Sequence, residues 1–144
     1  MQTIAVRRGE SEPELIEKPR PEPGPDEALV RILRVGVDGT DHEVLHDGPG
    51  EFPEDEDHIV LGHEAVGVVE DANGTAVEEG TVVAPLVRRP ADEVSQSGTN
   101  DELDMAPPTT VHERGITGAH GYLAEYFVSD PQYLVEVPES RSEY

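Results

Sequence analysis

A length of 144 residues suits a single domain with one hydrophobic core. Acidic residues outnumber basic ones 32 to 10, and the formal net charge of -22 excludes a nucleic-acid or anionic-membrane surface, because phosphate binding needs clustered Lys and Arg. The chain has no Cys, so it has neither disulfides nor thiolate metal sites, and any metal ligands must be His, Asp or Glu.

The acidic excess has two ordinary explanations, which are disorder and adaptation of a folded domain to concentrated salt. Hydrophobic residues make up 35% of the chain and fall in alternating runs such as 28–33 and 65–69, which favours a folded domain. Molar salt screens the repulsion between dense carboxylates. We therefore expect a folded, salt-adapted protein. No segment has the apolar length of a signal peptide or membrane span, so we expect a cytoplasmic location.

The first part of the chain is typical of short strands separated by turns. Residues 3–6 and 15–17 are predicted strands, and the proline-rich run 19–25 blocks helix formation after them. Residues 28–37 form the longest segment with period-2 hydrophobicity and predict a strand. The sequence Asp38-Gly39-Thr40-Asp41 is expected to turn the chain into a short helix over residues 42–45.

The middle of the chain continues the strand pattern after an acidic interruption. Residues 46–57 combine Gly and Pro with six acidic residues, which predicts a solvated loop. Strands are predicted at 59–61, 65–70 and 81–85, because Gly62 and the turn dipeptides Asn-Gly and Glu-Gly interrupt the hydrophobic runs.

The last part of the chain is expected to begin with a long surface loop over residues 86–114, which lack periodicity. Strands at 122–128 and 133–137 follow. The whole pattern indicates a mainly β domain over residues 1–144, folded as a small, strongly bent barrel with short helices. Five acids in the loop could bind a hard cation, although a solvated acidic loop is favoured: Asp92, Glu93, Asp101, Glu102 and Asp104.

The strongest chemical signal is the segment Gly62-His63-Glu64-Ala65-Val66-Gly67, in which an imidazole and a carboxylate lie between glycines. Such a pair alone more often makes ordinary hydrogen bonds than binds a metal. The strand-to-helix corner adds the carboxylate of Asp38. Oxygen and nitrogen ligands from Asp38, His63 and Glu64 could therefore converge on one divalent ion.

Together these segments resemble the zinc-binding core of the medium-chain dehydrogenase/reductase superfamily, whose N-terminal catalytic domain has a GroES-like fold. The resemblance covers essentially the whole chain and is greatest to archaeal glucose dehydrogenases of the halophilic type. Four motifs in order carry it: Val35-Gly36-Val37-Asp38-Gly39-Thr40-Asp41-His42-Glu43-Val44, Leu61-Gly62-His63-Glu64, Val87-Arg88-Arg89-Pro90 and Glu113-Arg114-Gly115-Ile116.

The resemblance implies roles for five residues. His63 would be a catalytic zinc ligand, Asp38 would be a ligand where most relatives have Cys, and Glu64 would be a direct or water-mediated ligand. Thr40 would contact the substrate oxygen and relay its proton, and Glu113 would accept hydrogen bonds from sugar hydroxyls. Because a carboxylate donates less charge than a thiolate, the zinc should be more electrophilic and more easily lost.

Simpler explanations exist for some of these residues. Thr40 also fits a plain helix N-cap, and Glu113 on composition alone is one more solvated acid. Asp41 is expected to be structural and buried against a cation. The other histidines have no evident partner at metal spacing and are assigned no role: His42, His46, His58, His112 and His120.

A nucleotide-binding motif is missing from the sequence. No Gly-x-Gly-x-x-Gly follows a strand, and Gly48-Pro49-Gly50 has Pro53 at the third glycine position. We therefore expect no cofactor-binding residues and no Rossmann domain in this chain. The loop 86–114 also lacks the four Cys that hold a structural zinc in many relatives.

The activity implied by the resemblance is zinc-dependent oxidation of glucose or a related aldose at C1 to the aldonolactone. Zn²⁺ would be bound here, and NADP or NAD would be held by a domain absent from this chain. The chain alone is then expected to be inactive, and the full-length protein could form a homo-oligomer. The alternative is a truncated, non-enzymatic metal- or sugar-binding barrel or an oligomerisation module.

Overall fold

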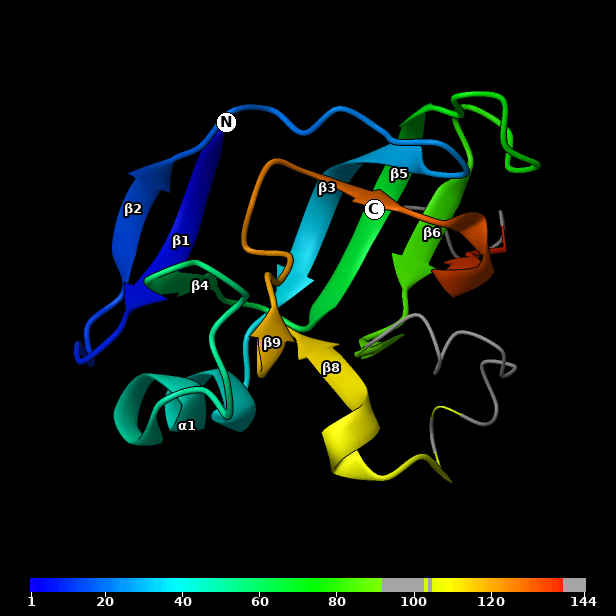
Figure 1. Ribbon diagram of the computed structural model, residues 1–144. Coiled ribbons are helices and arrows are strands. Elements are labelled where there is room, and N and C mark those ends of the chain that lie inside the picture. The colour runs from blue at the N-terminus through cyan, green and yellow to red at the C-terminus, as the bar shows by residue number, and fades with distance from the viewer. Residues whose placement is uncertain (92–102, 104, 139–144) are drawn as a thin grey trace.

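Antiparallel strands dominate the computed structural model of the chain, which describes residues 1–91, 103 and 105–138 (Figure 1). The strands form three sheets, and the helix α1 (Gly39–Asp47) lies beside them. The largest sheet has the order β10 (Tyr126–Ser129), β3 (Ala28–Gly36), β5 (Glu64–Asp71), β6 (Val82–Pro85) and β11 (Leu134–Glu136). Two three-stranded sheets have the orders β2 (Glu14–Glu17), β1 (Gln2–Arg7), β4 (His58–Val60) and β7 (Arg88–Pro90), β8 (Val111–Arg114), β9 (Gly118–Ala119). The expected mainly β fold is thus confirmed.

The five-stranded sheet owes its shape to β3. This strand pairs with β5 from Leu29↔Asp71 to Gly36↔Glu64, and the register shifts twice, between Leu29 and Val30 and between Ile32 and Arg34. Such irregularities bend a strand and increase its twist. One face of the sheet carries the main core cluster, and each large apolar side chain buried there contributes about 1.5–3 kcal/mol. The cluster contains Ala28, Val30, Val69, Val83, Tyr122 and Phe127.

A second apolar cluster joins α1 to the sheet that contains β1 and β4. Val44 on the inner face of the helix is 4% exposed and packs with Val6, Ile59 and Leu61. Figure 1 shows the helix below β4, at the end of the connection that leaves β3. The helix therefore follows the end of β3 in the large sheet and is anchored through Val44 to the sheet that contains β4.

The helix begins earlier than the sequence predicts. Asp38 is its N-cap, with its side chain accepting from the backbone N–H of Thr40, and Asp41 completes a capping box by accepting from the backbone N–H of Asp38. The helix therefore runs over Gly39–Asp47 rather than 42–45, and Thr40 is not its cap. A reciprocal pair of aspartates stabilises this start more than one hydroxyl would.

Residues 122–125 are not part of the strand predicted over 122–128, since β10 begins at Tyr126. Tyr122 and Leu123 instead donate their backbone N–H groups to the carbonyls of Gly62 and Leu61, each at 2.8 Å, and the Leu123 carbonyl accepts from Ile4. This segment crosses the junction between two sheets. Its hydrophobic residues are therefore buried without being part of a regular strand, which is why the pattern predicted a strand that is too long.

The predicted loop 86–114 contains regular structure at both of its ends. β7 and β8 pair antiparallel, with Arg88 opposite Glu113, and a 3₁₀ turn over Pro108–Thr110 precedes β8. A five-acid cation site in this loop lies outside the described residues: Asp92, Glu93, Asp101, Glu102 and Asp104. In the part of the chain that the structure describes, no helix is long and apolar enough to cross a membrane.

Candidate metal and sugar site

Asp38 and His63 come together although 24 residues separate them in the sequence. Asp38 follows the end of β3, and His63 precedes the start of β5, which pairs with β3 at Gly36↔Glu64. The distance from Asp38 Oδ2 to His63 Nε2 is 3.6 Å. The Asp38 side chain is 49% exposed and the His63 side chain 12%, so the pair opens to solvent on the carboxylate side. The predicted convergence of these two residues is therefore present.

The pair has the spacing of two ligands on one zinc ion. A distance of 3.6 Å is long for a hydrogen bond, but two ligands bound about 2.1 Å from a tetrahedral ion lie about 3.4 Å apart. His63 Nδ1 is buried and has no hydrogen-bond partner among the described residues. Imidazole nitrogen and carboxylate oxygen are both zinc donors, so the residues present fit this ion.

Asp41 forms the floor of the site. It is only 3% exposed, and its two oxygens accept the backbone N–H groups of Asp38 at 3.0 Å and Gly62 at 3.1 Å. Its Oδ1 also lies 3.7 Å from His63 Nδ1. Asp41 is buried, as predicted, and two backbone amides stabilise its charge, while the cation-type group beside it is the His63 ring, which is charged only when protonated.

The carboxyl group of Asp38 is held in its charged form. The hydrogen bond from the backbone N–H of Thr40 lowers its pKa most, partial burial opposes this effect, and the nearby His63 ring lowers the pKa further. Hydrogen bonding to the ionised form favours that form. Asp38 therefore presents an ionised oxygen toward His63 at neutral pH.

Glu64 lies outside the cluster that its neighbour His63 forms with Asp38 and Asp41. The ligand atoms of Asp38, Asp41 and His63 all lie within 4.8 Å of one another, and Glu64 does not join them. Its exposed side chain instead covers Gly36, where an added Cβ would lie 2.5 Å from Glu64 Oε2. The structure thus brings together two of the three predicted ligands and leaves Glu64 beside them.

Thr40 occupies the first turn of α1, two residues beyond Asp38. Its backbone N–H donates to Asp38 Oδ1 at 2.7 Å. Its side chain is half-buried, and a hydrogen bond from this side chain to Asp38 also helps to lower the pKa of that carboxyl group. The backbone and the side chain of Thr40 therefore both contact the Asp38 carboxylate, which places the Thr40 hydroxyl beside the candidate zinc ligand.

The turn that follows Glu113 packs against Gly62 through two glycines, Gly115 and Gly121. An added Cβ on Gly115 would lie 2.3 Å from the Gly62 carbonyl oxygen, and one on Gly121 would lie 2.2 Å from the same atom. Gly115 also has φ +79, a conformation that favours glycine. The end of β8 therefore packs directly on the residue that precedes His63, and Glu113 lies two residues before Gly115.

Glu113 is not simply an acid exposed to solvent, because its Oε1 accepts a hydrogen bond from Arg88 Nε at 3.0 Å. The two residues are direct cross-strand partners on β7 and β8. Such a partner fixes the direction of the Glu113 carboxylate, which composition alone would predict to be a freely moving surface acid.

A second cluster of titratable groups was missed by sequence reasoning. Glu56, His58 and His120 place ligand-type atoms within 4.8 Å of one another, so the prediction that His58 and His120 lack partners at metal spacing was wrong. Lys18 Nζ lies 2.9 Å from His58 Nε2 and 3.4 Å from Glu56 Oε2. The four residues come from three separate parts of the chain, so no local pattern predicts the cluster. The one sequence signal was that Lys18 is the only lysine in so acidic a sequence.

The contacts of this cluster are those of a hydrogen-bonded network. His120 Nδ1 accepts from the backbone N–H of Val60 at 3.0 Å, so the neutral ring carries its proton on Nε2, which faces Glu56 Oε1 at 3.2 Å. His58 Nδ1 faces Asp57, so His58 Nε2 can accept from Lys18. Lys18 Nζ also lies 3.2 Å from His120 Nε2, so an ammonium group already lies among the atoms that would otherwise surround a metal ion.

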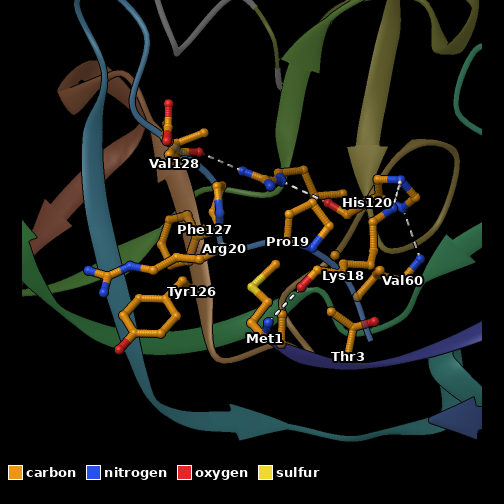
Figure 2. Close-up of a pocket in the computed structure, with 15 residues that line it drawn as sticks. Met1, Thr3, Lys18, Pro19, Arg20, Val60, His120, Tyr126, Phe127 and Val128 are labelled. Atoms are coloured by element: carbon orange, nitrogen blue, oxygen red, sulfur yellow. Dashed lines mark hydrogen bonds between the residues drawn. The ribbon is translucent and has the colours of Figure 1, made fainter. Parts of the chain in front are cut away.

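Lys18 and His120 also line one end of a cavity of about 410 Å³ (Figure 2). Tyr126 and Arg20 lie toward the opposite end, and Phe127 and Val128 contribute to a largely apolar wall. Neither Asp38 nor His63 lines it. The cavity is therefore separate from the candidate metal site.

Comparison with known proteins agrees with this geometry. The family model described as the alcohol dehydrogenase GroES-like domain matches residues 24–139. The glucose 1-dehydrogenase of Haloferax mediterranei is 61% identical over 148 residues, which cover 99% of this chain and 40% of the relative. The glucose 1-dehydrogenase of Haloarcula marismortui is 57% identical over 145 residues, covering 100% of this chain and 41% of the relative.

Solved structures give the same result. The Haloferax mediterranei glucose dehydrogenase in complex with NADP, Zn and gluconolactone superposes with a TM-score of 0.89 at 60% identity, covering 99% of this chain and 40% of that one. An NAD-dependent alcohol dehydrogenase superposes with a TM-score of 0.76 at 27% identity, covering 99% and 41%. The chain thus spans about 40% of the length of the relatives it matches. By sequence and by fold, it belongs to the alcohol dehydrogenase GroES-like domain family.

Proposed function

We propose that residues 1–144 form the catalytic GroES-like domain of a zinc-dependent glucose or aldose 1-dehydrogenase, with NADP or NAD held by a segment outside this chain. The single observation that carries the proposal is the 3.6 Å approach of Asp38 Oδ2 to His63 Nε2 above a buried carboxylate. The halophilic relatives, which are named as glucose 1-dehydrogenases, support the choice of substrate.

In this proposal Asp38 and His63 hold the zinc directly, and Glu64 contributes directly or through water. Zinc, when bound, supplies a Lewis acid that polarises the sugar 1-hydroxyl and eases its deprotonation. Asp41 aims the ring of His63 by lying 3.7 Å from Nδ1, which is the place that a carboxylate takes behind many zinc-bound histidines. Residues 38–41 thus position both proposed ligands: Asp38 is held by its place as the helix N-cap, and His63 is held by its contact with Asp41.

The sugar is handled by Thr40 and Glu113. The hydroxyl of Thr40 would contact the reacting hydroxyl and relay its proton, taking up that proton while its own O–H proton passes on to solvent, and the carboxylate of Glu113 would accept hydrogen bonds from other hydroxyls of the sugar. When bound, the nicotinamide would supply the acceptor for the hydride from C1, and the aldonolactone would be the product. A cytoplasmic location and a homo-oligomer of the full-length protein remain predictions from the sequence.

Zinc binding by the purified chain in molar KCl tests the proposal. Asp38→Ala and His63→Ala should each weaken the affinity severalfold in a chelator-competition titration, because each removes one ligand. His58→Ala is the matched control, since it removes an imidazole from the Lys18 network and should leave the affinity unchanged. Equal affinity in all three variants, or a loss confined to His58→Ala, would overturn the ligand assignment.

The alternative function, a non-enzymatic metal- or sugar-binding barrel, predicts the same zinc result but no turnover. The full-length protein that contains this domain should reduce NADP or NAD in the presence of glucose, and Asp38→Ala should abolish the reaction. Zinc binding without turnover of any aldose by the unaltered full-length protein would favour the non-enzymatic barrel.

A further inference from the structure

The ion pair between Arg88 and Glu113 joins two strands that lie side by side. Arg88 stands directly opposite Glu113 on the paired strands β7 and β8, and its Nε donates to Glu113 Oε1 at 3.0 Å. The side chains are 36% and 29% exposed, which leaves the pair half-buried, and the turn that follows Glu113 packs through Gly115 on Gly62, the residue before His63. A cross-strand partner of this kind restricts the rotamers of a carboxylate.

Arg88 also connects Glu113 to a third segment. Its Nη1 donates to the carbonyl oxygen of Leu103, a buried residue, at 3.3 Å. The planar guanidinium group is therefore oriented by the backbone at one end and by the carboxylate at the other. A guanidinium held in this way aims the carboxylate more firmly than a freely rotating cation would.

The direction of the bond leaves part of Glu113 available. Arg88 engages Oε1, and Oε2 accepts no hydrogen bond from the residues that the structure describes. The backbone of Glu113 is fixed as well, because its N–H donates to the Thr117 carbonyl at 2.9 Å and the following turn packs on Gly62 through Gly115. One oxygen is thus anchored while the other can accept from a ligand hydroxyl.

We infer that Arg88 is a positioning residue for the sugar, acting through Glu113 and setting how tightly the substrate hydroxyls are held. This inference rests on the proposed function and deepens it. Arg88 aligns the Glu113 carboxylate before the substrate arrives, so the substrate need not spend binding energy on ordering that side chain.

Steady-state kinetics of the full-length protein with glucose, in molar KCl, test this role. Arg88→Gln should raise KM about tenfold with a much smaller change in kcat, as expected when a charge-assisted hydrogen bond that orders a binding group is lost. Arg88→Lys should recover part of the loss, because an ammonium group can still donate one bond to Oε1. Zinc content and the unfolding midpoint show whether each variant is folded.

A double variant separates a positioning role from a general structural one. If Arg88 acts through Glu113, adding Arg88→Gln to Glu113→Gln should change KM no further than Glu113→Gln alone. Arg31→Gln is the matched control, because Arg31 Nε donates to Glu70 Oε2 at 3.1 Å in an ion pair on β3 and β5. Its KM should equal that of the unaltered protein.

The outcomes distinguish this inference from the proposed function. Normal turnover with an Arg88→Gln KM equal to that of the unaltered protein would overturn the positioning role alone. Independent, multiplicative effects of Arg88→Gln and Glu113→Gln would also overturn it. Absence of turnover of any aldose by the unaltered full-length protein would overturn the proposed function and this inference with it.

Discussion

The side chain of Asp41 joins the backbone of Gly62 to the start of α1. Its Oδ1 accepts the Gly62 N–H at 3.1 Å and its Oδ2 accepts the Asp38 N–H at 3.0 Å. These two amides belong to Asp38 itself and to the residue before His63, so one buried carboxylate fixes the backbone at both candidate zinc ligands. The site is therefore organised by protein contacts before any metal arrives.

Asp41→Asn should destabilise the domain and weaken zinc binding. The substituted amide keeps one oxygen acceptor but places an NH₂ group against a backbone N–H, and an unsatisfied buried donor costs about 1–3 kcal/mol. Denaturant unfolding in molar KCl measures this cost, and a chelator titration measures the zinc affinity. Asp71→Asn is the control, because Asp71 accepts from Asn73 N–H in an exposed turn and should cost less. Equal losses in the two variants would contradict the role of Asp41.

Asp38→Cys should separate metal retention from the stability of the metal-free domain. A thiolate bonds zinc more covalently than a carboxylate, so zinc should leave more slowly when a chelator is added. The same change removes the helix N-cap bond to Thr40, which should cost about 0.5–2 kcal/mol in the metal-free protein. Faster zinc loss from the Cys variant would show that residue 38 is not a ligand.

Gly115→Ala should be far more damaging than Gly74→Ala, although both glycines have positive φ, +79 and +77. An added Cβ meets nothing within 4 Å at Gly74, whereas at Gly115 it would lie 2.3 Å from the Gly62 carbonyl oxygen. Both variants bear a backbone penalty of about 1–2 kcal/mol. Overpacking should add about 1–3 kcal/mol for Gly115→Ala alone. Urea unfolding should reveal the difference, and similar midpoints would mean that the β8 turn can move away from Gly62.

Acidification should destabilise the domain partly through His120. Burial lowers the pKa of this imidazole, the contact with Glu56 opposes that effect, and Lys18 lowers the pKa further. Because the folded-state pKa lies below the ordinary value of about 6.5, the unfolded chain takes up the proton first as pH falls. The contribution of His120 is therefore complete above pH ~6.5 and is lost below it, by at most about 1.4 kcal/mol per pH unit.

His120→Asn provides the comparison, since its side-chain oxygen can still accept from the Val60 N–H. The free energy of unfolding, measured between pH 7 and pH 5 in constant salt, should fall less steeply in this variant than in the unaltered protein. Identical slopes would mean that His120 titrates alike in the folded and unfolded states.

The sequence was a good guide wherever one face of a strand is buried. The alternation in residues 28–37 and 65–70 predicted β3 (Ala28–Gly36) and β5 (Glu64–Asp71) to within one residue at each end, because period-2 patterning follows directly from a half-buried sheet. The corner aspartate and the Gly-flanked histidine were also found, since short motifs of this kind preserve the local geometry of a site.

Contacts between distant segments were beyond the reach of the sequence. The start of α1 depends on a reciprocal Asp38–Asp41 arrangement, which competes with the simpler expectation that Thr40 caps the helix. The Lys18 network depends on a fold that brings residue 120 against residues 56 and 58, and the pairing of Arg88 with Glu113 depends on the β7–β8 register. No periodicity within a window of residues encodes such pairings.

Lys18 is a defined site for chemical modification of the domain. It carries the only side-chain amine of the sequence, and that amine is 22% exposed and held by Glu56 and His58. An acylating reagent can therefore modify one lysine and the N-terminus, and the rate at which the lysine reacts reports how often its network opens. Labelling of a side-chain amine at one defined position therefore needs no engineered residue.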